Sequence, residues 1–132
     1  MSEGLPPYLA KIGPWLEAAV IETQGTHTIA DVLSAIASGR LHLWVGERCF
    51  AVTEFVTFPQ KRGFNVFLAG GEASEFKDIQ HGMEAFARAG GATLFMHQGK
   101  MTDDARRRVS AWERIGRGFK ATWIAMTKEL TP

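Results

Sequence analysis

The pattern of apolar and polar residues changes between residues 64 and 89, from a continuous apolar run to the spacing of a helix. Phe64 to Ala69 is a short apolar and aromatic run, typical of a strand that packs on both faces. Gly70-Gly71 follows and predicts a sharp turn, because glycine tolerates backbone conformations that other residues avoid. From Glu72 to Ala89 the apolar residues recur at helical spacing. Four of them are expected to form the buried face of this helix: Phe76, Ile79, Met83 and Phe86.

Two helices are predicted before this stretch. Pro14 is well placed as the first residue of a helix that ends near Gly25. Residues 1–13 contain two consecutive prolines and are expected to form an irregular N-terminal arm, with room for one helical turn around Tyr8 to Lys11. Thr28 can cap a second helix together with Asp31, because a capping residue and an acidic residue three positions on form a capping box.

Three consecutive strands are predicted to form an antiparallel meander. Residues 41–45 alternate as a strand does, Gly46-Glu47 predicts a hairpin turn, and residues 49–58 form a longer second strand. The polar loop at 59–63 leads to the third strand, which is the apolar run at residue 64. Connections this short join neighbouring antiparallel strands. The first strand would lie at an exposed sheet edge, where a further strand or a partner can add.

The rest of the chain predicts a strand, a helix and a strand. Residues 92–96 are apolar, and the helix that precedes them makes a crossover, so this strand should run parallel to the strand at residue 64. His97 to Met101 is expected to form a loop. Thr102 can cap another helix, and residues 119–128 are expected to form the last strand. The whole order predicts an α/β (α+β) fold: two N-terminal helices, a three-strand antiparallel meander, then helix, strand, helix and strand on one mixed sheet.

Composition narrows the class of protein. The chain has 132 residues, which suits a single domain over 14–132 after the arm. A net charge of +1 gives no global basic field that would favour nucleic acid. Cys49 is the one cysteine, which excludes an internal disulfide and a cysteine-based zinc site, and packing is its expected role. No spacing of histidines and carboxylates suits a metal. No apolar run approaches the roughly 20 residues that a membrane span requires.

The order of elements resembles the GCN5-related N-acetyltransferase (GNAT) fold without its usual first strand, over residues 14–130. Two local features carry the resemblance. One is the strand, glycine turn and helix at Leu68 to Ala73, and the other is the Ile115-Gly116-Arg117-Gly118-Phe119 exit from the last helix. The resemblance implies a scaffold that can hold acetyl-CoA beside the glycine turn.

That family holds the cofactor's pyrophosphate in a Gln/Arg-x-x-Gly-x-Gly/Ala loop, and the resemblance makes Gly70, Gly71 and Ala73 the candidate acyl-CoA loop. Gly71 and Ala73 match the last two positions, whereas Leu68 replaces the polar first one. Glu72 and Glu75 add negative charge where a diphosphate would lie. Two like charges about 6 Å apart, at an effective dielectric near 20, cost roughly 2–3 kcal/mol. We therefore expect a loop without cofactor, with acetyl-CoA as the alternative.

Glu54 is the candidate for catalysis. It lies on the more apolar face of its strand, where burial would make its carboxylate a stronger base. Family enzymes often use a strand glutamate to deprotonate the amine substrate. The interpretation we favour is that Glu54 lies at a solvated strand edge or pairs with Lys61 or Arg62.

Two other polar groups are weaker candidates. His97 and Gln98 follow a strand near the place where the family opens its sheet to the cofactor, and an ordinary loop position is expected for the histidine. Arg106-Arg107-Arg108 is the densest charge cluster and could contact nucleic acid. A solvated helix face, balanced by neighbouring acidic residues, is the expectation we prefer.

Three phrases resemble small acetyltransferase-like proteins of tailed phages and prophages, which are encoded among virion structural genes: Val52–Val56, Phe67–Gly71 and Glu84–Arg88. The resemblance implies a non-catalytic, virion-associated or assembly protein that associates with other phage structural proteins or with itself. The resemblance also implies that the protein is located in the virion or in the bacterial host cytoplasm. The alternative is an acyl-CoA-dependent N-acyltransferase in which Glu54 is the base.

Overall fold

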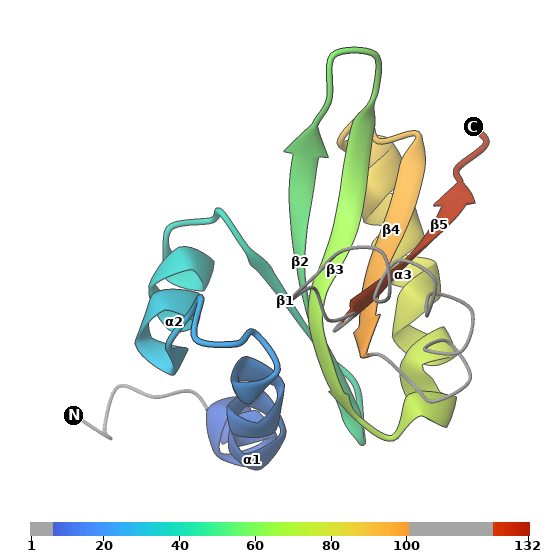
Figure 1. Cartoon of the computed structure of the whole chain (residues 1–132). Helices are drawn as coiled ribbons and strands as arrows, with labels where there is room; N and C mark the ends of the chain where they lie inside the picture. Colours follow the sequence, from blue (N-terminus) through green and yellow to red (C-terminus); the bar gives the residue numbers. More distant parts are fainter. Residues whose placement is uncertain (1–6, 101–122) are drawn as a thin grey trace, which may run out of the picture.

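A computed structural model describes residues 7–100 and 123–132 and shows a mixed α/β fold (Figure 1). The helices are α1 (Pro7–Ile21), α2 (Ile29–Ala37) and α3 (Phe76–Ala89), with a short 3-10 turn, η2 (Ala73–Glu75), before α3. The strands are β1 (His42–Val45), β2 (Cys49–Thr57), β3 (Arg62–Gly71), β4 (Leu94–Lys100) and β5 (Trp123–Glu129).

The five strands form one sheet in the order β1-β2-β3-β4-β5. β1, β2 and β3 pair antiparallel, β3 and β4 pair parallel, and β4 and β5 pair antiparallel. The predicted meander is therefore confirmed, and so is the parallel crossover through α3. The helix expected after Thr102, the Arg106–Arg108 cluster and the exit at Ile115–Phe119 lie outside the described residues.

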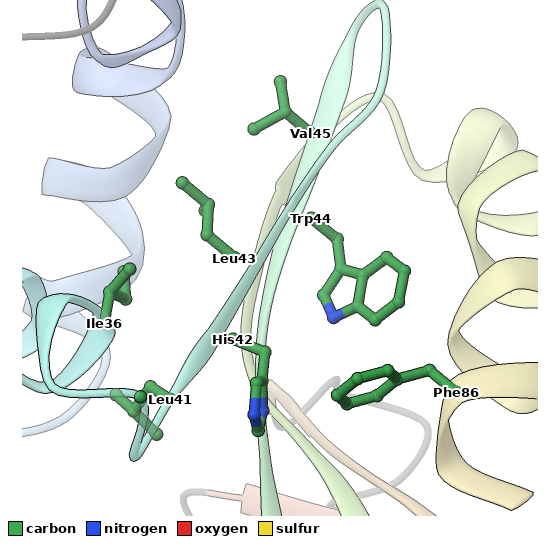
Figure 2. A pocket seen from close by; sticks show the side chains of 8 residues that line it. Ile36, Leu41, His42, Leu43, Trp44, Val45 and Phe86 are labelled. Carbon is green, nitrogen blue, oxygen red and sulfur yellow. The ribbon is translucent and has the colours of Figure 1, made fainter. Parts of the chain in front are cut away.

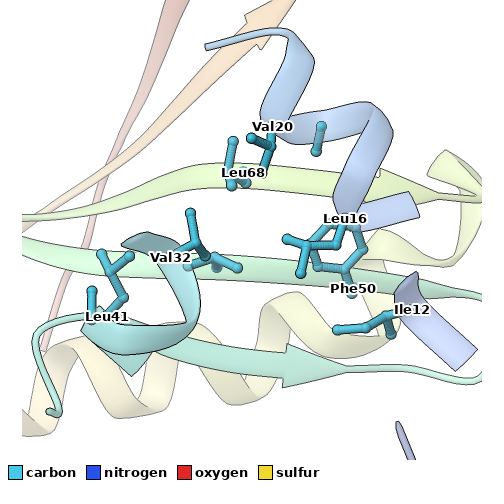
Figure 3. Close-up of a cluster of buried hydrophobic side chains, with 10 residues drawn as sticks. Ile12, Leu16, Val20, Val32, Leu41, Phe50 and Leu68 are labelled. Carbon is cyan, nitrogen blue, oxygen red and sulfur yellow. The ribbon is translucent and has the colours of Figure 1, made fainter. Parts of the chain in front are cut away.

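Each face of the sheet has its own core, because the helices lie on both sides of the sheet (Figure 1). α1 and α2 pack on one face, and Figure 3 shows their side chains meeting those of β2 and β3. The buried residues of this first core are Ile12, Leu16, Ala19, Val20, Val32, Ala35, Leu41, Phe50, Val52 and Leu68. α3 packs on the opposite face. The buried residues of this second core are Ala51, Phe64, Val66, Met83, Ala87, Ala92, Phe95 and Leu130.

The first helix begins at Pro7 rather than at Pro14, so all of residues 7–13 are helical where an irregular arm with a single helical turn at Tyr8 to Lys11 was expected. Pro7 occupies the first helical position, where the missing N–H breaks no hydrogen bond. Pro14 lies inside the helix. Gly13 precedes it and lacks the Cβ that a following proline would crowd. Ile12, from the expected arm, is fully buried in the first core, so packing outweighs the local preference.

The capping box of α2 is confirmed. The Asp31 N–H donates to Thr28 Oγ1 at 3.1 Å, and the Thr28 N–H donates to Asp31 Oδ2 at 2.9 Å. The hydrogen bond from the Thr28 backbone lowers the pKa of Asp31. The Asp31 carboxylate therefore serves to cap the N-terminus of α2.

The two central glycines lie in β3 and not in a turn after it. Gly70 pairs with Phe50 and Gly71 pairs with Cys49. A Cβ on Gly70 would lie 2.6 Å from the Phe50 ring, and one on Gly71 would collide with the Arg48 carbonyl oxygen. Gly71 also has a φ of +88°, which side chains disfavour. These glycines let the β1–β2 hairpin approach β3 closely, and α3 begins only after η2. Residues 70–75, which lead from the end of β3 through η2 to α3, are called the glycine turn.

β4 extends further than its sequence predicts. Residues 97–100 were expected in a loop, yet β4 pairs with β5 from Leu94 opposite Glu129 to Lys100 opposite Trp123. The ladder of main-chain hydrogen bonds therefore overrides the polar composition of this segment.

No helix in residues 7–100 and 123–132 has both the length and the apolar character needed to cross a membrane.

Candidate functional site

The candidate acyl-CoA loop is closed by the tip of the β1–β2 hairpin. The Glu72 N–H donates to the Arg48 carbonyl oxygen at 2.8 Å. The Arg48 guanidinium lies 3.3 Å from a Glu72 carboxylate oxygen and 3.2 Å from a Glu75 carboxylate oxygen. One main-chain donor of the loop is therefore already used, and both acidic side chains of the loop are paired with the Arg48 guanidinium.

The same contacts explain why the loop is glycine-rich. Gly70 makes room for Phe50 and Gly71 makes room for the Arg48 backbone, so both glycines serve chain packing. Ala73, the third candidate, is exposed at the start of η2. Glu75 keeps one buried carboxylate oxygen without a hydrogen-bond partner. A diphosphate approaching Ala73 would meet this carboxylate and would have to displace Arg48. The sequence had revealed the acidic residues but not their basic partner.

Glu54 belongs to a polar row that crosses three strands. Asn65 Nδ2 donates to Glu54 Oε2 at 2.9 Å and to Gln98 Oε1 at 3.2 Å. Asn65 is buried, with 4% of its surface exposed, and its Oδ1 has no partner. Glu54 is half-buried. The expected pairing with Arg62 is not formed, because that guanidinium lies 4.0 Å from the centre of the Phe55 ring and donates to the Gly90 carbonyl oxygen.

A β-bulge in β3 brings Glu54 and Asn65 together. β2 and β3 pair in one register from Cys49 opposite Gly71 to Val52 opposite Leu68. If this register continued, Val66 would lie opposite Glu54. Phe67 is the extra residue, so Asn65 takes that place. A bulge shifts the face of every following residue, and sequence alternation alone could not have shown it.

Glu54 opens on a polar cleft of about 470 Å³ between the α1–α2 connection and β2. Thr26, His27, Asp31, Ser34, Arg40 and Glu54 contribute its polar side chains. Several are already engaged: Asp31 caps α2 and Thr26 Oγ1 lies 2.7 Å from His27 Nδ1. Arg40 Nε donates to Ser38 Oγ. The cleft gives solvent and small molecules access to Glu54, which is what a base would need.

His97 and Gln98 point to opposite faces of the sheet. The His97 ring stacks on Phe76, with centroids 5.2 Å apart and an interplanar angle of 20°. Burial lowers the pKa of His97, which favours the neutral ring. Gln98 instead joins Asn65 in the polar row. The two residues therefore do not form one site, and His97 is a strand residue rather than the expected loop residue.

β3 and β4 separate beyond these residues. Their parallel pairing runs from Gly63 opposite Leu94 to Val66 opposite His97. β3 continues to Gly71 and β4 to Lys100. Residues 67–71 of β3 and residues 98–100 of β4 therefore do not pair with each other. This unpaired part lies at the end of β3 that carries Gly70 and Gly71.

The edge of the sheet at β1 carries an apolar groove of about 560 Å³. Figure 2 shows Ile36, Leu41, Leu43 and Val45 on one side of the strand, and His42, Trp44 and Phe86 on the other. Trp44 is fixed there, because its Nε1 donates to Thr53 Oγ1 at 2.9 Å and its ring contacts Phe86 edge-on at 5.5 Å. The groove therefore has apolar walls on both sides of the edge.

The main chain of β1 faces outward at two positions. The Gly46 N–H donates to the Cys49 carbonyl oxygen, so these residues form the hydrogen-bonded pair next to the hairpin tip. Hydrogen-bonded pairs alternate along an antiparallel ladder, which directs the N–H and C=O groups of Leu43 and Val45 away from β2. Within the described residues no strand pairs with this outer side. β1 also contains no Asp, Glu, Lys or Arg.

Two further sequence predictions concern the single cysteine and a metal site. Cys49 is buried, as the packing interpretation predicts, and burial raises the pKa of its thiol. In residues 7–100 and 123–132, no cluster of three or more histidines, cysteines and carboxylates could hold a metal ion.

Comparison with models of known protein families, with curated proteins and with solved structures finds no match. The glycine turn, the polar row and the β1 edge are therefore the features of the molecule that bear on its function.

Proposed function

We propose that this chain is a non-catalytic protein–protein association module on a GNAT-like scaffold, with a role in the assembly or structure of a phage particle. The observation that carries the association is the β1 edge, where outward main-chain groups lie between two apolar walls. The phage setting, the location in a virion or host cytoplasm and the GNAT-like relationship come from the sequence resemblance.

Association would proceed by strand addition. An extended segment of the partner would pair with the N–H and C=O groups of Leu43 and Val45, and its side chains would enter the groove. Because apolar residues line both sides of β1, the segment needs apolar side chains on both of its faces. A charged residue in that segment would lose water without gaining a partner. The partner class we propose is a phage structural protein that exposes such a segment, and a second copy of this chain belongs to that class.

The glycine turn supports the absence of catalysis. Arg48 uses one main-chain donor of the turn and pairs with both acidic residues at its mouth. A cofactor diphosphate would have to break these contacts before it reached the helix start, and it would then face two unpaired carboxylates.

The second candidate function is an acyl-CoA-dependent N-acyltransferase that acts on an amine. Two observations favour it: Glu54 opens on the 470 Å³ cleft, and β3 separates from β4 beyond Val66. In this alternative Gly70, Gly71 and Ala73 would hold the diphosphate of acetyl-CoA, and Glu54 would take the proton of the amine.

A thermal-shift titration with acetyl-CoA separates the two functions. A ligand at about 100 times its Kd stabilises a fold by ~2.7 kcal/mol, which moves Tm visibly. We expect no shift at millimolar acetyl-CoA. The control is Ala73→Glu, because Ala73 is exposed and the variant adds bulk and charge to the mouth without touching the core. A shift in the wild type that disappears in Ala73→Glu would establish the cofactor site and overturn the proposal.

The association itself is tested with purified structural proteins encoded by the genes that flank this one. We expect one of them to bind the immobilised chain, and binding to be lost in Val45→Lys. The matched control is Ile21→Lys, which introduces the same charge at an exposed β-branched residue on the end of α1. Binding that survives Val45→Lys would refute association through β1.

A further inference from the structure

The groove at β1 also restricts what can occupy it. It accepts a short extended segment without charges and with apolar side chains on both faces. β1 and the residue before it form a segment without Asp, Glu, Lys or Arg: Leu41, Leu43 and Val45 lie on one side, and His42 and Trp44 lie on the other. We infer that a second copy of this chain occupies the edge, with the two β1 strands paired antiparallel about a two-fold axis. This inference rests on the proposed association function and names its partner.

The main-chain geometry fits this pairing. If the two Trp44 residues lie opposite each other, Leu43 of each copy lies opposite Val45 of the other. Leu43 and Val45 are the β1 residues with outward N–H and C=O groups, so both cross-pairs form two hydrogen bonds. The outward N–H and C=O groups of Leu43 and Val45 in both copies would then all have hydrogen-bond partners. A shift by one residue would pair outward groups with inward ones.

The side chains fit it as well. On the α2 side, Leu43 and Val45 of the two copies would lie against each other. On the α3 side, the two Trp44 rings would become neighbours, each already flanked by Phe86. Val45 is 37% exposed and Phe86 is 38% exposed, and both are large apolar side chains at the rim of this groove. Pairing of β1 with β1 would cover them.

The other edge of the sheet is a poorer partner for β1. β5 carries Lys128 and Glu129, and Lys128 pairs with Glu84 of α3 at 3.0 Å. Laid in the apolar groove, that strand would bring charged groups out of water. Pairing of β1 with β1 also closes on itself, because each copy uses the same surface and no further edge is offered at β1. It therefore predicts a dimer and not a growing fibre.

Sedimentation velocity of the full chain at increasing concentration tests the inference. We expect the wild type to reach twice its monomer mass of 14.6 kDa. Val45→Lys should remain monomeric, and Ile21→Lys should dimerise like the wild type. Val45→Pro provides a second disruption, since it removes the outward N–H at a position where the β1–β2 ladder does not use it. Circular dichroism confirms that each variant is folded.

Amide hydrogen exchange locates the contact. The Leu43 and Val45 amides of the wild type should exchange at least tenfold more slowly at a concentration where the dimer dominates than in the dilute monomer. A wild type that stays monomeric throughout, a dimer unaffected by Val45→Lys and Val45→Pro, or a dimer with unprotected Leu43 and Val45 amides would each overturn the inference.

The outcomes also separate this inference from the proposed function. A monomeric chain that still binds a phage structural protein through Val45 overturns the second-copy inference and leaves the association function standing. Binding of acetyl-CoA that Ala73→Glu abolishes overturns the proposed function, whether or not a dimer forms.

Discussion

The glycine turn and the β1 edge are both places where main-chain groups come to the surface, but the hairpin contacts the turn, whereas no strand of residues 7–100 and 123–132 pairs with the outer side of β1. At the turn, the Arg48 carbonyl oxygen accepts the Glu72 N–H, and the Arg48 side chain pairs with two carboxylates. At the edge, the outward groups of Leu43 and Val45 lie in an apolar groove. One hairpin makes both, since Arg48 lies at its tip and β1 is its first strand.

This difference indicates where binding free energy is available. A ligand at the turn must first displace an intramolecular hydrogen bond and two ion pairs, and gains little net free energy in exchange. A strand at the edge replaces only water, and it buries apolar side chains on both faces. A glycine-rich turn before a helix is therefore insufficient evidence for an anion site when another segment already uses one of its amides and a cation pairs with its acidic side chains.

The largest expected effect comes from forcing the turn open with Gly71→Ala. The new Cβ would collide with the Arg48 carbonyl oxygen, and the backbone has a φ of +88°. We expect the free energy of unfolding to fall by about 3–5 kcal/mol, measured by urea denaturation. Gly25→Ala is the matched control, because Gly25 has a φ of +80° with open space around it. We expect Gly25→Ala to lower the free energy of unfolding by about 1 kcal/mol, which measures the cost of the positive φ alone. Equal losses in both variants would contradict close packing at the turn.

The next effect concerns the wall of the groove. Phe86 contacts the rings of His42, Trp44, Phe55 and Phe64, with centroids 4.9–5.9 Å apart. Phe86→Ala should lower the free energy of unfolding by about 2 kcal/mol, less than for a fully buried ring because Phe86 is partly exposed. His81→Ala, at an exposed position of the same helix, should change it by less than about 0.5 kcal/mol. A Phe86→Ala variant as stable as His81→Ala would show that the wall is not fixed.

A smaller effect on stability is expected at β5, the edge strand opposite β1. Unlike β1, this strand is linked to α3 by an ion pair between Lys128 and Glu84. Glu84 accepts hydrogen bonds from Gln80 and Lys128, and these lower its pKa below the ordinary value of 4.5. Since the pKa is lowered in the folded state, the stabilisation is complete above the ordinary value and disappears as the pH falls through the folded-state value. We expect Glu84→Gln to be about 1 kcal/mol less stable than the wild type near neutral pH. The difference should shrink steadily in acid.

Chemical denaturation of both proteins from about pH 7 down to about pH 3 measures this difference. A gap between them that is constant with pH would contradict the role of the Glu84 carboxylate.

The smallest effect comes from removing the cation that closes the turn. Arg48→Met should lower the free energy of unfolding by about 0.5–1 kcal/mol, because the Arg48 side chain is 60% exposed and its ion pairs are screened by water. The loss should diminish at ~1 M salt, where the Debye length is about 3 Å. Acetyl-CoA should still not bind, because Glu72 and Glu75 lose their partner. Binding that appears in Arg48→Met would show that the turn is an anion site held shut by this side chain.

Local patterns predicted much of the fold. The capping box at Thr28, the meander and the parallel crossover all follow from spacing within short windows. The start of α1 did not, because a proline inside a helix is locally unfavourable and tertiary contacts, including the burial of Ile12 and the packing of Leu9, offset it. The strand character of residues 97–100 did not either, since it depends on pairing with β5.

The candidate sites were harder to predict, because their chemistry depends on contacts between distant segments. Arg48 and Glu72 meet through the register of β2 with β3. Glu54 and Asn65 meet through a bulge that a polar and apolar pattern does not reveal. The open edge at residues 41–45 could be predicted, since it needs only the position of the first strand in a meander.

The two separate cores have a consequence for synthesis of the chain. Every buried side chain of the first core belongs to residues 12–68, so this core can close while the later segments are still inside the ribosome. The opposite face of β2 and β3, with Ala51, Phe64 and Val66, then stays bare until α3 emerges to cover it. A nascent chain of that length would be the species that most needs a chaperone.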